Sequence, residues 1–150
     1  QNFIVQMIPH HRAAIAMSCN LLEYPADPAL CAIASRIIVE QTRSVANMQR
    51  IECACARLVN PYEDVCTYQR QMDAIMQTMF TDMGAACADN RINCNFMREM
   101  IPHHQGAIAM ANTTLQYVIC PPLTPILRAI VTSQEQGVRQ MRQLLHRLGC

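Results

Sequence analysis

An internal duplication constrains the fold of this chain more than any other feature. Residues 2–50 align with residues 95–143 at a constant offset of 93 without a gap, and 20 of the 49 aligned positions are identical. The densest part sets FIVQMIPHHRAAIAM over FMREMIPHHQGAIAM. A repeat of this kind indicates one supersecondary unit used twice. Whatever fold the first unit adopts, we expect the second to adopt it too.

Each unit has the pattern of a helical hairpin. The stripe-forming residues at the start of unit one are Phe3, Met7, His10, Ala14, Met17 and Leu21. They recur at steps of four and three, which places them along one face of an α-helix. After a connection that contains Pro25 and Pro28, a second stripe runs from Leu30 to Met48. Two helices on either side of such a connection predict an antiparallel hairpin.

The segment between the units adds one more helix. Asn60-Pro61 breaks the chain, and apolar residues then recur at helical spacing, which predicts a crossover helix over about residues 62–84. No segment alternates at period two, so strands are not expected. The 150 residues therefore predict a single all-α domain over 1–150. The architecture we expect is a ferritin-like four-helix bundle of two duplicated hairpins joined by a crossover helix.

Composition excludes several classes of partner. The net charge is +1, only 15% of residues are charged, and no basic run is present. These features argue against a nucleic-acid partner or an anionic membrane surface. No stretch approaches the roughly 18 continuous apolar residues of a membrane span, so membrane insertion is not expected.

The chemistry of the repeat lies in its histidines and methionines. His10-His11 follows Met7 at a spacing of three, and His103-His104 follows Met100 in the same way. Thioether and imidazole are the ligands that Cu(I) prefers, and imidazole also suits Cu(II). We therefore expect copper as the bound metal ion. Because imidazole must be unprotonated to coordinate, binding should weaken below about pH 6.

The orientation of these side chains can be predicted in part. Neighbouring residues on a helix diverge by about 100°, so we expect His10 and His103 to face the core with His11 and His104 flanking them. The antiparallel register places His10 level with Gln41, and the aligned His103 level with Gln134. A hydrogen bond from each glutamine to the imidazole at its level is the expected partner.

Methionine also has an ordinary structural role. A methionine stripe at helical spacing usually fills a core. We assign that role to the crossover methionines Met72, Met76, Met79 and Met83. The alternative to a metal site is a methionine-filled core with hydrogen-bonded histidines.

The paired MIPHH motif resembles a known family. With the following helix that carries Gln, Val and Met, it is similar to the CopM-like copper-binding proteins, a bacterial family of domains of unknown function (family 305), whose pattern is MIxHHxxAIxMA followed by QxxEIxxM. The likeness covers nearly the whole chain. It implies a ferritin-like bundle, a periplasmic location and a part in copper binding or resistance. Matching the motif implies as metal ligands His10, His11, Met7, Met17 and Met48 of unit one and His103, His104, Met100, Met110 and Met141 of unit two.

The chain departs from the family pattern at one repeated position. Where that pattern has Glu, this chain has Ser44 and Gly137. The expected function is an extracytoplasmic copper-binding protein for sequestration or resistance. The alternative is a disulfide-stapled structural or assembly module whose metal site is weakened or lost. An enzyme is not expected, because the glutamates near these helices, Glu40, Glu99 and Glu135, do not occupy repeated positions as in ferritin-like oxidases.

The nine cysteines predict an oxidising compartment. Such a content is high for a reduced cytosolic protein, so we expect a secreted, periplasmic or extracellular location. At one end of the expected bundle lie Cys19, Cys31, Cys87, Cys94 and Cys150, and at the other lie Cys53, Cys55, Cys66 and Cys120. We expect staples across connections, such as Cys19 to Cys31 and Cys53 or Cys55 to Cys66. An odd count leaves one thiol, and Cys150 at the chain end is our candidate for a link between molecules, in a homo-oligomer or disulfide-linked assembly.

Overall fold

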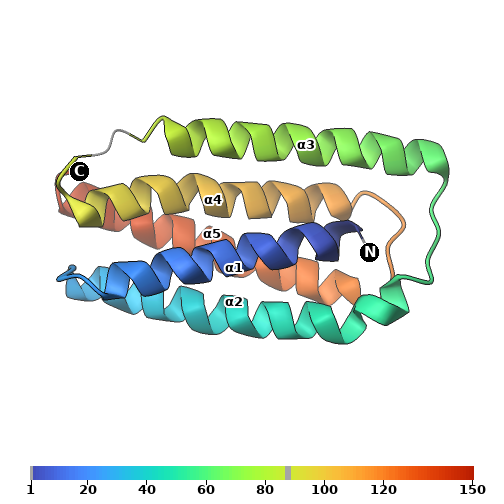
Figure 1. Ribbon diagram of the computed structural model, residues 1–150, viewed down its shortest axis with the longest axis horizontal. Helices are drawn as coiled ribbons and strands as arrows, with labels where there is room; N and C mark the ends of the chain where they lie inside the picture. Colours follow the sequence, from blue (N-terminus) through green and yellow to red (C-terminus); the bar gives the residue numbers. More distant parts are fainter. Residues whose placement is uncertain (1, 87–88) are drawn as a thin grey trace.

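The structure, a computed structural model, describes residues 2–86 and 89–150, and in this part of the chain every regular element is an α-helix (Figure 1). The helices are α1 (Asn2–Leu22), α2 (Pro28–Cys55), α3 (Tyr62–Gly84), α4 (Ile92–Thr114) and α5 (Leu123–Arg147). The all-α prediction is confirmed. Helix α3 spans the segment that we expected to form the crossover.

Four of the helices form a closed ring. Helix α1 packs on α2 and α4 packs on α5, and the two hairpins meet through α2 against α5 and α1 against α4. Helix α3 lies outside this ring, on α4, and returns the chain along the whole length of the bundle (Figure 1). Two hairpins with one long crossover have the connectivity of ferritin-like bundles. The four-helix bundle is therefore as expected.

The start of α2 shows how local chemistry sets a helix boundary. The Asp27 side chain accepts hydrogen bonds from the backbone N–H groups of Ala29 and Leu30 at 2.8 and 3.3 Å, and Pro28 takes the first helical position. Both features satisfy or remove N–H groups that would lack a partner. In unit two the position aligned with Asp27 is Cys120, so α5 begins without a side-chain cap.

The two repeated prolines lie inside helices. Pro9 is in α1 and Pro102 is in α4. A proline there removes one backbone hydrogen bond to the carbonyl four residues earlier.

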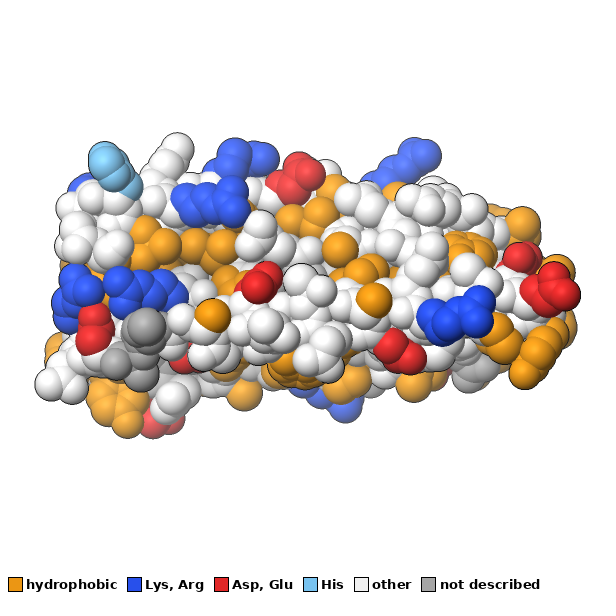
Figure 2. All heavy atoms as spheres, turned by 90° about the horizontal axis from the view of Figure 1, so that it is seen from above, with side chains coloured by type: hydrophobic (Ala, Val, Ile, Leu, Met, Phe, Trp, Pro, Cys, Tyr) orange, Lys and Arg blue, Asp and Glu red, His pale blue; other side chains and the backbone are white. Residues whose placement is uncertain are grey.

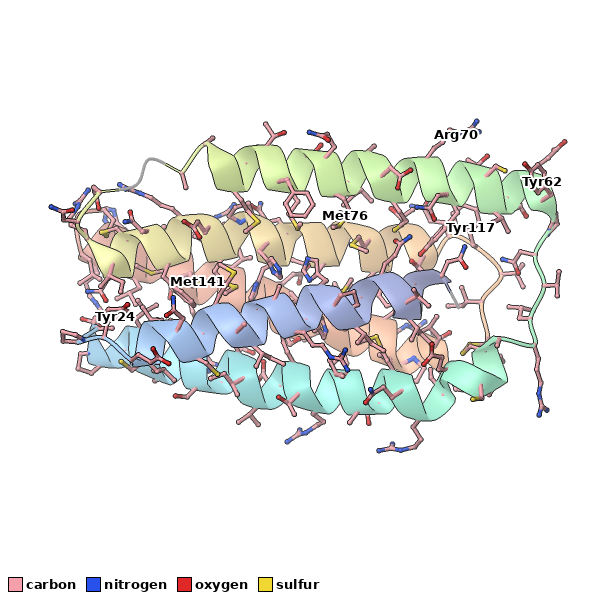
Figure 3. The ribbon with its side chains drawn as sticks, in the orientation of Figure 1. Tyr24, Tyr62, Arg70, Met76, Tyr117 and Met141 are labelled. Carbon is pink, nitrogen blue, oxygen red and sulfur yellow. A yellow bond between two sulfur atoms is a disulfide. The ribbon has the colours of Figure 1, made fainter. Side chains whose placement is uncertain are left out.

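The bundle core consists of two apolar clusters. The first contains Met7, Met48 and Met110, and the second contains Met100 and Met141. The buried polar residues of the helices at mid-length are His10, His11, Gln41, His103, His104 and Gln134. Figure 3 shows Met141 toward the end of the bundle that holds Tyr24, away from Tyr117, which packs on the first cluster. The core therefore has a histidine layer, defined as these four histidines, between two apolar halves.

The disulfides join cysteines that we placed at the same end of the bundle, but not the pairs that we expected. Cys55 is bonded to Cys120 and Cys94 to Cys150. Helix α5 ends in a turn in which Gly149 has φ of 64° and the Cys150 N–H bonds to the Leu145 carbonyl at 3.0 Å. This turn directs the last residue back to the start of α4. Our assignment of Cys150 as the leftover thiol was therefore wrong.

The remaining cysteines are unpaired or outside the described residues. The free thiols are those of Cys19, Cys31, Cys53 and Cys66, so the staples expected from Cys19 to Cys31 and onto Cys66 are not formed. Cys87 lies outside the residues that the structure describes. The prediction failed because spacing along the chain favoured short loops, whereas the actual disulfides close long ones.

The outer surface of the bundle is mixed in character. The face formed by α3 carries both arginine and acidic side chains with apolar side chains scattered between them (Figure 2). Within residues 2–86 and 89–150, no helix combines the length and the apolar character needed to cross a membrane.

Candidate metal centre

Four imidazoles form a row across the middle of the bundle. The rings of His10 and His103 lie at the centre, with centroids 3.8 Å apart and planes inclined by 37°. The ring centroid of His11 lies 6.2 Å from that of His10, and the ring centroid of His104 lies 6.4 Å from that of His103. The exposed fraction of each residue is 6% or less. The two residues expected to flank the site are therefore as deeply buried as the central pair.

The crossover helix adds a thioether to this row. The Met79 Sδ lies 3.3 Å from the Nε2 of His10. A thioether sulfur carries no hydrogen, so in a hydrogen bond between them the imidazole Nε2–H donates. Met79 is buried but belongs to neither apolar cluster. Sequence reasoning assigned it to core filling and missed this contact, because the crossover has no counterpart in the repeat.

Gly106 makes this contact sterically possible. A Cβ at Gly106 would lie 2.6 Å from the Met79 Sδ, so a larger residue would require the Met79 side chain to shift away from its present position. The aligned residue of unit one is Ala13, which is exposed. A glycine inside a helix costs about 1 kcal/mol relative to alanine and often marks a close approach. That signal was present in the sequence and could have indicated the position of α3.

The positions where the family pattern has Glu face the outer imidazoles. The Ser44 Oγ lies 3.1 Å from the Nε2 of His11. In unit two, a Cβ at Gly137 would lie 2.9 Å from Cδ2 and 3.1 Å from Nε2 of His104. The outer imidazole of each half therefore faces the same position of the repeat. In unit one this position presents the Ser44 hydroxyl to His11, and in unit two it is Gly137, which has no side chain, beside His104.

Several polar atoms in the layer lack partners. The Nδ1 atoms of His11 and His103 and the Oε1 atoms of Gln41 and Gln134 are buried without a hydrogen bond to any of the residues described. The glutamine-to-histidine hydrogen bonds that we expected are not formed within this part of the chain. Buried polar groups are nearly always paired, so unpaired ones need an explanation.

Burial keeps the histidines neutral. It lowers the pKa of His11 and of His104 to about 3, with repulsion from His103 adding to the effect, and it lowers the pKa of His103 to about 4. Burial also lowers the pKa of His10 well below 6.5, followed by the effect of the three neighbouring imidazoles. Neutral imidazole is the form that binds metal. The row therefore offers nitrogen ligands at physiological pH without first losing protons.

The possible metal-binding atoms that lie in contact in this structure are imidazole nitrogen and thioether sulfur. Among residues 2–86 and 89–150, no three His, Cys, Asp or Glu side chains come together as a metal site. The imidazole pair His10–His103 and the imidazole–thioether contact His10–Met79 are the juxtapositions that the structure does provide. This chemistry fits a soft monovalent ion such as Cu(I).

The predicted methionine ligands divide between the two sides of the layer. Fully buried in the apolar halves are Met7, Met48, Met100, Met110 and Met141. Met17 instead is half-buried and lines a surface groove together with Asn20 and Glu99. Met17 is thus the predicted ligand that the structure leaves at the surface.

Comparison with known proteins supports a relation to copper-binding structures. CopM in the Cu(I)-bound form is 26% identical with a TM-score of 0.74, and the match covers 99% of this chain and 96% of that one. CopM in the Cu(II)-bound form is 26% identical with a TM-score of 0.73, covering 97% and 95%. A DUF305 fragment from Deinococcus radiodurans, 23% identical with a TM-score of 0.69, shares the fold over 97% and 94%. No curated protein sequence matches the chain.

The family is settled by the extent of one match. The model of the domain of unknown function DUF305 matches residues 1–145. This range includes both repeat units, the crossover and all four histidines of the layer. The chain therefore belongs to the DUF305 family.

Proposed function

We propose that this protein binds copper outside the cytoplasm through methionine and histidine ligands, for sequestration or resistance, and that it does not catalyse a reaction. Copper is then the cargo of the protein. The observation that carries the proposal is the row of four buried, neutral imidazoles in contact with a thioether. The imidazole nitrogens and the thioether sulfur that meet there are ligands that suit copper.

The relatives support copper as the ion. CopM, whose structures match nearly the whole length of this chain, binds both Cu(I) and Cu(II) according to the bound forms. Imidazole suits both oxidation states, and thioether favours Cu(I). We infer that the central pair His10 and His103 together with buried methionine sulfur holds Cu(I).

The extracytoplasmic location is inferred from redox chemistry. Disulfides persist in oxidising compartments, and the structure holds the pairs Cys55–Cys120 and Cys94–Cys150. The same disulfides would suit the alternative of a structural module. Nothing in the comparisons favours that alternative over copper binding.

A double variant tests the proposal. In His10→Ala/His103→Ala the central nitrogen pair is lost, so Cu(I) affinity should fall by at least about tenfold. Affinity is measured by competition with a coloured Cu(I) chelator, and circular dichroism checks that the helices remain. The control is His146→Ala, which removes an exposed histidine outside the layer. Unchanged affinity in the folded double variant would overturn the proposed function.

A further inference from the structure

Helix α3 reaches the histidine layer through Met79. Its buried residues are Tyr68, Met72 and Met79. The first two belong to an apolar cluster, whereas Met79 belongs to neither cluster and reaches His10. Met79 is therefore the one buried side chain of this helix that is not accounted for by packing in the apolar core.

Met79 also lines a groove that opens to solvent. The groove lies between α3 and α4 and has a volume of about 410 Å³. Its lining includes Thr78, Met79 and Asp82 from α3 and Pro102 and Gly106 from α4. Asp82 is the one charged residue among those that line it, so the groove favours a cation. Figure 3 shows the neighbouring Met76 pointing from α3 toward α4, which marks the interface along which the groove runs.

The spacing of the donors suits metal exchange. A first-row ion bound tetrahedrally by imidazole at about 2.0 Å and sulfur at about 2.3 Å separates the two donors by roughly 3.5 Å. The separation in the structure is 3.3 Å from Met79 Sδ to His10 Nε2. One ion can therefore touch both atoms with little movement of either side chain.

We propose that Cu(I) enters through the groove between α3 and α4, binds first to the Met79 Sδ, and passes from there to the Nε2 of His10. The inference rests on the proposed function and adds the path by which the ion reaches a buried site. The step is a ligand exchange without electron transfer. A copper–sulfur bond forms as a bond from copper to its carrier ligand breaks, and a copper–nitrogen bond then forms as the copper–sulfur bond breaks. The imidazole proton leaves Nε2 and Nδ1 takes up a proton, so the ring stays neutral.

Loading kinetics test this path directly. Cu(I) is supplied as its complex with a coloured chelator, and stopped-flow absorbance follows its transfer to the whole protein. Met79→Leu keeps an apolar side chain of similar size but removes the sulfur. Transfer should slow by about tenfold or more, as expected when a group that orients or completes a site is removed. Met72→Leu is the matched control, because Met72 is a buried methionine of the same helix away from the groove.

Two further variants separate the steps. Gly106→Ala places a Cβ 2.6 Å from the present Met79 Sδ and displaces it, so transfer should slow as in Met79→Leu, and the two changes together should slow it no further. Asp82→Asn should slow transfer at low salt and leave equilibrium affinity unchanged, because it alters only the attraction of the cation. Copper X-ray absorption of Met79→Leu during loading should show fewer sulfur neighbours than in the parent protein.

The outcomes distinguish this inference from the proposed function. If Met79→Leu loads at the rate of Met72→Leu while the variant without His10 and His103 loses affinity, the entry path is wrong and copper binding stands. If the parent protein takes no Cu(I) from the chelator, both fail. A slow Met79→Leu, with a parent protein that loads fast, supports both.

Discussion

At the scale of single residues, burial of the four histidines keeps their imidazoles neutral and able to bind metal, and it makes the folded protein less stable in acid. Burial lowers the pKa of His11, His103 and His104 to about 3 to 4, so protons compete for the nitrogens only in acid. Our expectation from the sequence, a loss of copper binding below about pH 6, assumed an ordinary histidine pKa. In this environment the loss is expected at lower pH, provided that the protein stays folded.

The same pKa shifts predict how stability depends on pH. The unfolded chain takes up a proton on each histidine near pH 6.5, whereas in the folded protein His11, His103 and His104 do so only near pH 3 to 4. Between these values the unfolded state binds more protons. Stability is therefore full above about pH 6.5 and falls as the pH drops, by up to about 1.4 kcal/mol per pH unit for each buried histidine.

Urea unfolding of the metal-free protein at pH 7, 6 and 5 measures this slope. His11→Leu removes one titrating group from the layer, so the free energy of unfolding should fall less steeply in this variant. A free energy that does not change between pH 7 and pH 5 would show that the histidines are not held neutral.

The position of the missing glutamate gives a second prediction at this scale. In Ser44→Glu the new carboxylate lies against the Nε2 of His11, so it should raise the pKa of His11 and strengthen Cu(I) binding by orienting the ring. The gain is expected to be within about tenfold to 100-fold, as for outer-shell partners. NMR titration of the imidazole and chelator competition measure the two effects.

The equivalent change in unit two is expected to differ. Gly137→Glu places a Cβ 2.9 Å from the Cδ2 of His104, so that buried ring has to move. Gly137→Ala isolates this steric cost from the charge. Equal behaviour of Ser44→Glu and Gly137→Glu would mean that His104 is free to give way.

At the scale of elements, the sequence predicted the ring of four helices and did not predict the contacts of the crossover helix α3. Periodicity and the duplication were enough for α1, α2, α4 and α5, because each stripe has to be buried against another helix. The inward histidines followed from the same stripes. Helix α3 occurs once, so the repeat does not indicate which of its faces packs on the bundle. Its methionines were therefore predicted to fill the core. The partners of Met79 depend on packing over long sequence distances, which spacing does not encode.

Tyr68 anchors α3 toward the end of that helix away from Met79. Its hydroxyl lies 3.1 Å from the Thr114 Oγ1 of α4, and its ring packs edge-on against Tyr117 at 5.4 Å. Tyr68→Phe removes the hydroxyl and keeps the ring, so the free energy of unfolding should fall by about 0.5 to 1.5 kcal/mol. Thr114→Val is the matched change on the other partner. In a double-mutant cycle measured by urea unfolding, purely additive losses would argue that the two hydroxyls do not interact.

At the scale of the whole molecule, the two disulfides close the ends of the bundle. Cys55–Cys120 and Cys94–Cys150 span 65 and 56 residues of chain. The cysteine count indicated an oxidised protein but could not indicate these pairs, because the partners meet only after the helices have packed. Sequence spacing alone favours loops shorter than those observed.

Removing one disulfide should therefore lower stability substantially. Cys55→Ser/Cys120→Ser opens a long loop, and we expect a loss of about 2 to 4 kcal/mol in the free energy of unfolding. Cys53→Ser is the control, since Cys53 is a free, exposed thiol at the end of the same helix. Mass mapping without reduction should find the two disulfides within a single chain. A dimer that needs Cys150 for its covalent link would contradict this arrangement.

The facing rings of His10 and His103 bear on how the two repeat units can diverge in sequence. His10 and His103 are the same residue of the repeat and face each other directly, as residues on the axis of an isologous C2 dimer do. In a homodimer of one hairpin, every substitution would appear on both sides of that axis. Joining the two hairpins in one chain removes this coupling, so Gly106 can accept α3 while Ala13 stays exposed. The covalent link thus allows the two halves of a two-fold site to differ, with α3 packed against one half.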